Sequence, residues 1–264
     1  MDMMLLPPVW RIYWSVLAFA FGAALGSFLH CAAWRTVRGE PFVSGRSRCP
    51  SCGATLGARD LVPILSWVAL HGRCRRCGAP IGVRYPLTEL LSALVTLAIV
   101  WRFGIGIPAA RNLVFCSCLL FLSLTDLDDC IIPDGCLCVA ALAWAIAAPL
   151  LGMSWGGALR ALGAGLTFGA ALLVVSLVMD RVLGRESLGG GDIKLFAVVG
   201  LYLGFVGTLF TLILACVLGL LLALALRRRG AFPFGPAIAA ASGVMLLFGG
   251  GLVERYLALL GGSL

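Results

Sequence analysis

Two separate stretches of the chain carry carboxylates that could act together. In one stretch, Asp192 follows a run of three glycines and precedes Lys194. The other stretch carries four acids in one short segment: Asp126, Asp128, Asp129 and Asp134. Two Asp side chains held close together share one proton, so one can accept a proton from water while the other donates to a carbonyl oxygen. These residue types therefore favour hydrolysis of a peptide bond without a metal ion.

Both stretches lie at the ends of apolar segments, which places the acids at a membrane boundary. An ionisable side chain there is costly and usually has a partner or a function. Asp126 directly follows an apolar run and is the deepest of the four upstream acids. Asp128 and Asp129 are typical of solvated loop acids, and Asp134 is typical of a helix N-cap. The spacing alone leaves all four open as the partner of Asp192.

Four of the 11 cysteines form two C-x-x-C pairs in one polar segment: Cys49 with Cys52, and Cys74 with Cys77. Two such turns can supply four thiolates to a tetrahedral Zn²⁺. The segment is too short for a sizeable core, so a structural metal would contribute much of its folding free energy. Reduced thiols and two local redox pairs are the alternatives. The other cysteines lie in or beside apolar runs, where cysteine is usually a small buried hydrophobe.

The composition indicates which elements must position these groups. The chain has 264 residues, of which 61% are hydrophobic and 12% charged, and its mean hydropathy is +1.04. Long apolar runs satisfy their backbone groups in lipid as helices. We therefore expect an all-α polytopic membrane protein with about eight transmembrane helices. The expected spans are residues 13–34, 85–101, 113–125 (starting near 107), 137–151, 158–182, 195–205, 206–226 and 232–253.

Arginine is distributed unevenly between the loops. The net charge is +8, Lys194 is the one lysine, and nine arginines lie within residues 35–85. Basic loops stay in the cytoplasm, so this segment and, by counting spans, both acidic stretches are expected on the cytoplasmic side. Topology and lipid head groups account for these charges, so nucleic acid is not an expected partner. The expected parts are a first transmembrane helix (1–34), a small four-cysteine domain (35–85) and a transmembrane core (86–264).

In this order, the motifs resemble the type IV prepilin peptidases, the leader peptidase/N-methyltransferase family of type IV pilus and type II secretion systems. Residues 184–195, GRESLGGGDIKL, are similar to the family's G-K-E-G-M-G-x-G-D-F-K-L, and residues 124–134 to its I-D-x-D-x-x-x-L-P-D. The four-cysteine segment follows the family's loop in order, through Arg84-Tyr85-Pro86-Leu87-x-Glu89. Gly26-Ser27-Phe28-Leu29 and Phe234-Gly235-Pro236 match as well. The resemblance covers residues 20–240, nearly the whole chain.

The resemblance implies a membrane-embedded aspartic endopeptidase of the bacterial inner membrane. Its catalytic pair would be Asp126 and Asp192. The supporting loop would contain Gly189, Gly190, Gly191, Lys194 and Glu186. The substrates would be prepilins or pseudopilins, cleaved after the Gly that ends a short basic leader. The family also methylates the new N-terminal residue with S-adenosylmethionine. No glycine-rich dinucleotide-type loop marks the methyl-donor site, so the sequence assigns no residues to it.

Two histidines and one short segment need separate interpretation, and two of these three features depart from the family's motifs. His30 stands where the family commonly has Asn, and at a helix end it is expected to be a polar cap or a lipid-interface residue. His71 precedes the second cysteine pair and could ligate a metal, although four cysteines already suffice. Residues 59–63, Arg-Asp-Leu-Val-Pro, replace the family's usual E-N-I-P.

Three rival functions fit parts of the sequence. A leader peptidase without methyl transfer is separated from the two-activity enzyme by an assay for a methylated product. An ion-coupled transporter would use membrane carboxylates as an ion path, but it predicts acids near the middle of the membrane and gives the cysteine segment no role. A zinc-ribbon membrane scaffold would bind a partner through the arginine-rich segment and would leave Asp126 and Asp192 dispensable.

Overall fold

The computed structural model describes residues 2–41, 45–184, 187–226 and 232–259. By contacts between residues, the chain divides into two compact units, Met1–Leu113 and Val114–Leu264. Within the described residues the regular elements are helices, apart from two isolated bridges that pair Arg48 with Thr55 and Arg73 with Pro80. The prediction of an all-α fold is therefore confirmed.

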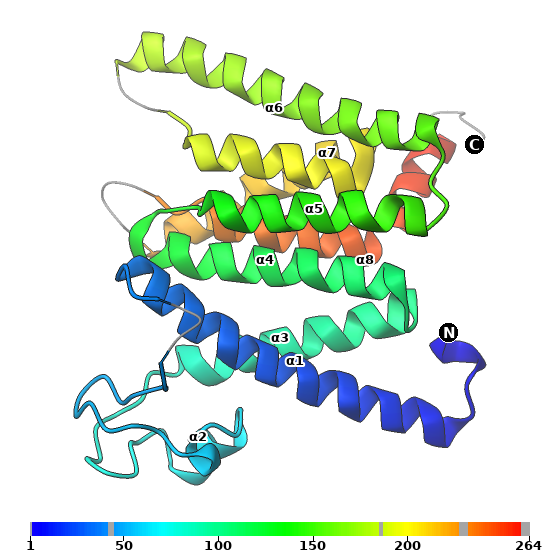
Figure 1. The fold of residues 1–264 in the computed structure, drawn as a ribbon. Coiled ribbons are helices and arrows are strands. Elements are labelled where there is room, and N and C mark those ends of the chain that lie inside the picture. Colours follow the sequence, from blue (N-terminus) through cyan, green and yellow to red (C-terminus); the bar gives the residue numbers. More distant parts are fainter. Residues whose placement is uncertain (1, 42–44, 185–186, 227–231, 260–264) are drawn as a thin grey trace. The chain divides into compact units, whose positions relative to one another are not determined.

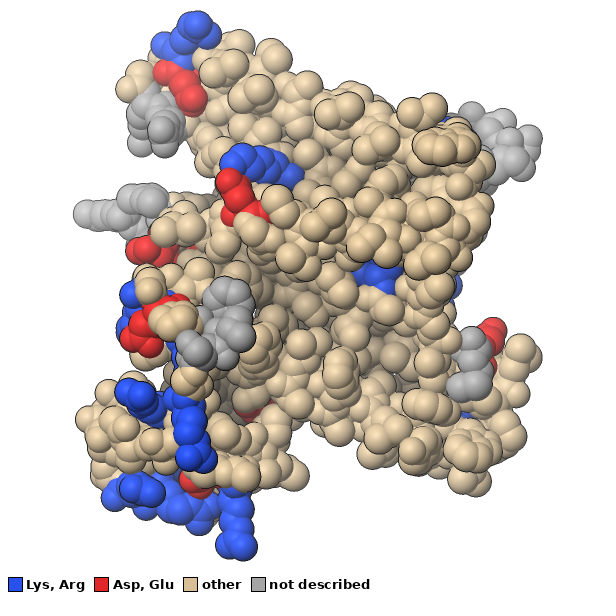
Figure 2. Space-filling view, in the orientation of Figure 1, with Lys and Arg blue, Asp and Glu red and all other residues tan. Residues whose placement is uncertain are grey.

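Most helices are long and apolar enough to cross a bilayer. Within the described residues these are α1 (Pro8–Val37), α3 (Arg84–Phe103), α4 (Ile107–Asp129), α6 (Trp155–Leu183), α7 (Gly190–Leu226) and α8 (Gly235–Leu259), shown in Figure 1. The shorter apolar helix α5 (Asp134–Leu150) joins them. Figure 2 shows a broad uncharged surface, with charged side chains mainly toward the helix ends. The prediction of a polytopic membrane protein is confirmed.

Helix α7 consists of two segments that meet at Gly204, where φ is 65° and ψ is −174°. Glycine adopts such angles at low cost, whereas other residues do not. Asp192, near the start of α7, interacts with Asp126, which bonds to the first residue of α8. A Cβ on Gly219 would lie 2.7 Å from the ring of Phe234, which immediately precedes α8. A straight helix would separate positions 192 and 219 by about 40 Å. Positions 192 and 219 nevertheless both lie near the start of α8, which a straight helix does not allow. The chain therefore reverses at Gly204, where the sequence predicted a boundary between two spans.

In the first unit, α1 packs closely against α3 because small residues line the contact. A Cβ on Gly22 would lie 2.6 Å from Oγ1 of Thr96, and one on Gly26 would lie 2.9 Å from Cα of Glu89. Such small-x-x-x-small spacing allows membrane helices to approach through their backbones. The polar segment between the two helices contains the short helices η2 (Ala58–Asp60) and α2 (Leu65–Ala69), and η1 (Met3–Leu5) precedes α1.

In the second unit, α5, α6 and α8 all pack against α7 (Figure 1). Side chains from α4, α5, α7 and α8 form one apolar core. Within it, the ring of Phe115 stacks on Tyr202 with 3.9 Å between centroids, and the Tyr202 hydroxyl donates to the carbonyl of Ala140 at 2.8 Å. This core holds in place the helix ends that carry the acids.

Candidate active site and metal centre

Asp126 lies in the last turns of α4 and is 5% exposed. The buried residues Leu122, Leu124 and Thr125 precede it and fix that face of the helix in the apolar core. Helix α4 ends three residues later, and Cys130 follows with a left-handed φ of 54°. A carboxylate is therefore held rigidly, and almost out of contact with solvent, where the helix leaves the core.

The backbone at the start of α8 holds one oxygen of Asp126. The N–H of Gly235 donates to Oδ2 of Asp126 at 2.7 Å. A Cβ on Gly235 would lie 2.8 Å from the same oxygen, so the approach requires glycine. The first N–H groups of a helix have no partner within the helix and carry a partial positive charge, so they bind anions well. The sequence motif Phe234-Gly235-Pro236 marked this segment, but its contact with Asp126 was not predicted.

Asp192 lies in the first turn of α7, and its N–H donates to the carbonyl of Gly189 at 3.0 Å. Its Oδ1 is buried and has no hydrogen-bond partner among the described residues. The carboxyl groups of Asp192 and Asp126 interact electrostatically. A buried polar atom without a partner is costly. A water molecule or a substrate carbonyl that bonded to Oδ1 would remove that cost.

The two acidic stretches meet through direct packing. A Cβ on Gly191 would lie 2.8 Å from Cβ of Ile132, which lies between α4 and α5. The ammonium group of Lys194 binds both carboxylate oxygens of Asp134, at 2.8 and 2.9 Å. These contacts link the first turns of α5 and α7, and they account for the glycine at position 191.

The other upstream acids differ in part from their expected positions. Asp128 and Asp129 are solvent-exposed, as expected, but they belong to the last turn of α4 and not to a loop. The expected N-cap role of Asp134 is wrong: Pro133 is the N-cap, and Asp134 is the first helical residue and pairs with Lys194. A proline that continues directly into a helix leaves the following acid inside the first turn, where its charge favours the helix N-terminus.

The four predicted cysteines converge in the first unit. The sulfur atoms of Cys49, Cys52, Cys74 and Cys77 all lie within 4.8 Å of one another. A tetrahedral ion with bonds of 2.3 Å to sulfur requires about 3.8 Å between sulfurs, and the sulfurs of Cys49 and Cys77 are 3.9 Å apart. This donor set fits a bound metal ion of the zinc type.

Both cysteine turns use the same backbone arrangement. The backbone carbonyl of Cys49 accepts a hydrogen bond from the N–H of Gly53 at 2.9 Å, and the carbonyl of Cys74 accepts one from the N–H of Gly78 at 2.9 Å. Both glycines have left-handed φ angles, 67° and 71°. The backbone N–H groups that follow Cys49 point toward its sulfur and lower the pKa of that thiol to about 6. A thiol that ionises easily is a ready metal ligand.

The two histidines lie elsewhere. The expectation for His30 was wrong: it is buried between α1 and α3, with Nδ1 3.1 Å from the hydroxyl of Thr88 and its ring 4.0 Å from that of Tyr85. The close approach of the two helices removes this position from the lipid interface. His71 is exposed and outside the four-cysteine cluster. Glu186, expected in the supporting loop, lies outside the described residues.

Fold and site together define a multi-pass membrane protein with a carboxylate pair at helix ends and a separate four-cysteine centre. Residues 20–103 match the model of the bacterial peptidase A24 N-terminal domain, and residues 113–224 match that of the type IV leader peptidase family. The chain belongs to the type IV leader peptidase family, as its motifs predicted.

Relatives named prepilin leader peptidase/N-methyltransferase cover most of the chain. The protein from Bacillus subtilis (strain 168) is 34% identical over 249 residues, which is 91% of this chain and 97% of the relative. The protein from Pseudomonas putida is 31% identical over 277 residues, 94% of this chain and 96% of the relative. The protein from Myxococcus xanthus (strain DK1622) is 38% identical over 230 residues, 85% of this chain and 68% of the relative. No solved structure matches the chain.

Proposed function

We propose that this protein is an aspartic endopeptidase that cleaves the leader of type IV prepilins or pseudopilins after glycine and then methylates the new N-terminus. The observation that carries the peptidase assignment is that Asp126 and Asp192, from two distant motifs, lie near enough to interact electrostatically. One acid is anchored by the N–H of Gly235, and the other has a buried oxygen without a described partner. Family membership and the names of the relatives support the same reaction.

In this proposal the two carboxyl groups share one proton. One carboxylate accepts a proton from the attacking water, and the other donates to the carbonyl oxygen of the scissile peptide. The N–H of Gly235 orients Asp126, and Oδ1 of Asp192 is the atom that would meet the substrate or the water. The two protons of such a pair are lost in steps that belong to the pair, not to either residue alone.

The neighbouring residues have positioning roles in this proposal. Gly189 immediately precedes helix α7 and Gly190 is its first residue. Gly191 leaves room for the side chain of Ile132, and Lys194 pairs with Asp134 at the start of α5. Four acids, Asp128, Asp129, Asp134 and Glu186, would attract the positive charge of the basic leader. A charge swap between leader and acids that left cleavage unaltered would argue against this attraction.

The bacterial inner membrane is the proposed location, with the acids and the four-cysteine segment facing the cytoplasm. The arginine-rich composition of residues 35–85 supports this orientation. The substrate's basic leader would stay on the same side by the same rule, while its apolar helix would lie in the bilayer. The proposed functional parts are a first transmembrane helix (1–34), a small four-cysteine domain (35–85) and a transmembrane peptidase core (86–264).

Zinc is the proposed structural metal and S-adenosylmethionine the proposed methyl donor. Cys49, Cys52, Cys74 and Cys77 would hold the metal with no open position for water, so we give it no catalytic step. When bound, the methyl donor supplies an electrophilic methyl group. The protein's contribution to that second reaction is to hold the amine and the donor in line.

The test uses a peptide with a basic leader, Gly-Phe and an apolar helix, and the purified protein. Asp126→Asn and Asp192→Asn should both abolish cleavage while the protein stays folded. Asp129→Asn is the matched comparison, because Asp129 is an exposed acid in the same last turn of α4: it should raise KM for the basic leader at most and leave kcat unchanged. Normal cleavage by either of the first two variants would refute the catalytic pair. Mass analysis of the wild-type product, with S-adenosylmethionine present, separates the two-activity enzyme from a peptidase alone.

The positions of the two acids argue against the transporter alternative. Asp126 and Asp192 both lie at helix ends, not in the middle of a span. An ion path through the membrane would place carboxylates along its length. Cleavage without any ion dependence would complete the argument against that alternative.

A further inference from the structure

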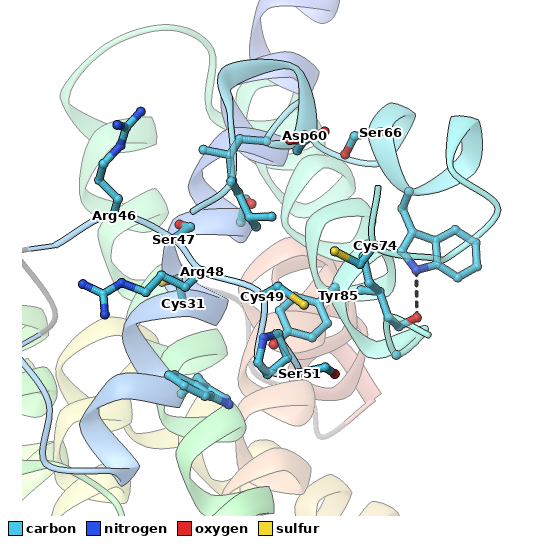
Figure 3. A pocket seen from close by; sticks show the side chains of 18 of the residues that line it. Cys31, Arg46, Ser47, Arg48, Cys49, Ser51, Asp60, Ser66, Cys74 and Tyr85 are labelled. Atoms are coloured by element: carbon cyan, nitrogen blue, oxygen red, sulfur yellow. Dashed lines mark hydrogen bonds between the residues drawn. The ribbon is translucent and has the colours of Figure 1, made fainter. Parts of the chain in front are cut away.

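The short helix α2, in the polar segment of the first unit, has two different faces. Its inner side chains, Ser66 and Trp67, line a cavity of about 660 Å³ (Figure 3). On the outer face, Leu65 is 68% exposed and Val68 is 59% exposed, and Val62, just before the helix, is 42% exposed. None of these three side chains lines the cavity. We call Val62, Leu65 and Val68 the α2 patch.

Two contacts of Trp67 fix which face of α2 points inward. Its indole N–H donates to the carbonyl of Ile81 at 3.1 Å, the dashed line in Figure 3. A Cβ on Gly72, which has a φ of 67°, would lie 2.8 Å from the Trp67 ring, so the ring packs directly on the backbone there. Because Trp67 is held inward, Leu65 and Val68 are held outward, and the helix cannot rotate to bury them.

A hydrogen bond from the residue before α2 holds this helix beside α3. The buried carboxylate of Glu89, in the second turn of α3, accepts from the N–H of Ile64 at 2.7 Å. Ile64 has a φ of 62°, which is strained for a β-branched residue and persists only where surrounding contacts maintain it. Helix α2 therefore begins beside the first turns of a helix that is long and apolar enough to span the membrane.

The length of α3 places its first turns at the level of the lipid head groups. It has 20 residues, about 30 Å, which matches the thickness of the hydrocarbon core. Val83, Leu87 and Leu91, at intervals of four residues, are 55%, 58% and 51% exposed and form one apolar face suited to lipid. The α2 patch lies beside the start of this helix, so the boundary of the bilayer is the nearest apolar environment for it.

The charge of the polar segment complements an anionic lipid surface. Between residues 35 and 85 there are nine arginines and two acids, and Figure 2 shows basic side chains gathered over this segment. Asp60, one of the two acids, already pairs with Arg75 at 2.7 Å. Basic clusters next to a spanning helix attract anionic phospholipids, and elements that lie in the interface combine an apolar face with basic residues. The exposed arginines of the cysteine-rich part are Arg46, Arg48, Arg59, Arg73, Arg75 and Arg76.

We propose that the four-cysteine segment docks on the surface of the bilayer that its own flanking helices cross. The α2 patch inserts at the boundary between head groups and acyl chains, and the exposed arginines contact the phosphates of anionic phospholipids. This interaction accounts for an exposed apolar patch on a segment that is otherwise polar. It depends on the membrane location of the chain and not on the proposed cleavage or methylation.

The first experiment detects lipid at the α2 patch by photo-cross-linking. The full chain, with p-benzoyl-phenylalanine in place of Val68, is placed in nanodiscs that contain phosphatidylcholine and phosphatidylglycerol. Irradiation should give covalent lipid adducts, read by mass analysis of the protein. The matched control carries the same residue in place of Thr55, an exposed polar position of the same segment outside the patch, and should give several-fold fewer adducts. An unchanged unfolding temperature shows that each variant is folded.

A second measurement tests the role of the arginines. Adducts at position 68 should contain phosphatidylglycerol several-fold above its share of the disc. Combining Arg59→Gln, Arg73→Gln and Arg76→Gln should remove this enrichment and leave adducts in the ratio of the two lipids. Arg75 is kept because it pairs with Asp60. Arg160→Gln removes a charge from the other unit and should leave the enrichment unchanged.

Three results would overturn the proposal. One is a folded protein that gives no lipid adduct at position 68, or gives adducts only with a second protein chain, which would assign the patch to a protein interface. Another is equal labelling of lipid from positions 55 and 68. The third is a wild-type lipid ratio equal to that of the disc, which would remove the preference for anionic lipid. The reading needs no substrate, so it is independent of whether the chain cleaves or methylates.

Discussion

The contact between Gly235 and Asp126 can be tested with one methyl group. In Gly235→Ala, the new Cβ would lie 2.8 Å from Oδ2, 3.2 Å from Cγ and 3.3 Å from Cβ of Asp126. Carbon and oxygen atoms cannot stay at 2.8 Å, so either the carboxylate turns away or the start of α8 moves. Both responses lengthen the hydrogen bond of 2.7 Å from the N–H of Gly235.

The size of the effect follows from the bond that is lost. A hydrogen bond to a charged group contributes about 1.5–3 kcal/mol. If the bond orients Asp126 in the transition state, its loss reduces kcat/KM by about 10- to 150-fold, since each 1.36 kcal/mol is tenfold in rate. The loss should fall mainly on kcat, because Gly235 touches the catalytic acid and the substrate's leader binds elsewhere in the proposal.

The assay is cleavage of the prepilin-type peptide by purified protein, with kcat and KM determined separately. The matched control is Gly243→Ala on the same helix, because a Cβ at that position meets no atom within 4 Å. Alanine in a helix interior is also more favourable than glycine by up to about 1 kcal/mol. The control should therefore cleave normally and unfold at an equal or higher temperature.

Two results would contradict this reasoning. Wild-type cleavage by Gly235→Ala would show that Asp126 does not need the N–H at the start of α8. A large rise in KM with unchanged kcat would assign Gly235 to substrate binding.

Three further predictions follow from contacts described above. Lys194→Ala should reduce cleavage less than about fivefold, because its ion pair with Asp134 is exposed and such pairs contribute about 1 kcal/mol or less; a loss of a hundredfold would indicate direct contact with substrate. Metal analysis should find one ion per chain, Cys52→Ser should lower that content and Cys216→Ser should not, because Cys216 is outside the four-cysteine cluster. Gly204→Ala should lower the free energy of unfolding by about 1–3 kcal/mol, because a side chain is strained at these backbone angles, and unchanged stability would mean that the break is elsewhere.

Some features were predictable from the sequence because a local pattern carries them. Apolar runs located the membrane helices, and the boundary expected between residues 205 and 206 fell beside Gly204, where the backbone breaks. The spacing of the cysteines predicted a cluster that the sulfur positions confirm. Asp126 was singled out by its depth, and it is the buried acid among the four upstream candidates.

Other features depend on approach between distant segments, which no local pattern encodes. The N–H of Gly235 reaches Asp126 across 109 residues of sequence. His30 was expected at a surface, but the glycines at 22 and 26 bring α1 so close to α3 that it is buried. The position of the four-cysteine segment also needs tertiary contacts, because the hydrogen bond from the N–H of Ile64 to Glu89 forms only when that segment folds against α3.

The positions of three helix starts explain why a site of this chemistry can exist at a membrane boundary. Asp192 lies in the first turn of α7, Asp134 is the first residue of α5, and Asp126 bonds to the first residue of α8. Each helix N-terminus carries a partial positive charge that stabilises a nearby anion by about 0.3–1 kcal/mol, and more when partly buried. In the proposed reaction, these backbone dipoles would stabilise negative charge near the proton that the two acids share. They are fixed before substrate arrives, so no reorganisation is needed during the reaction. Placing the acids at helix ends, and not within the spans, supplies these dipoles.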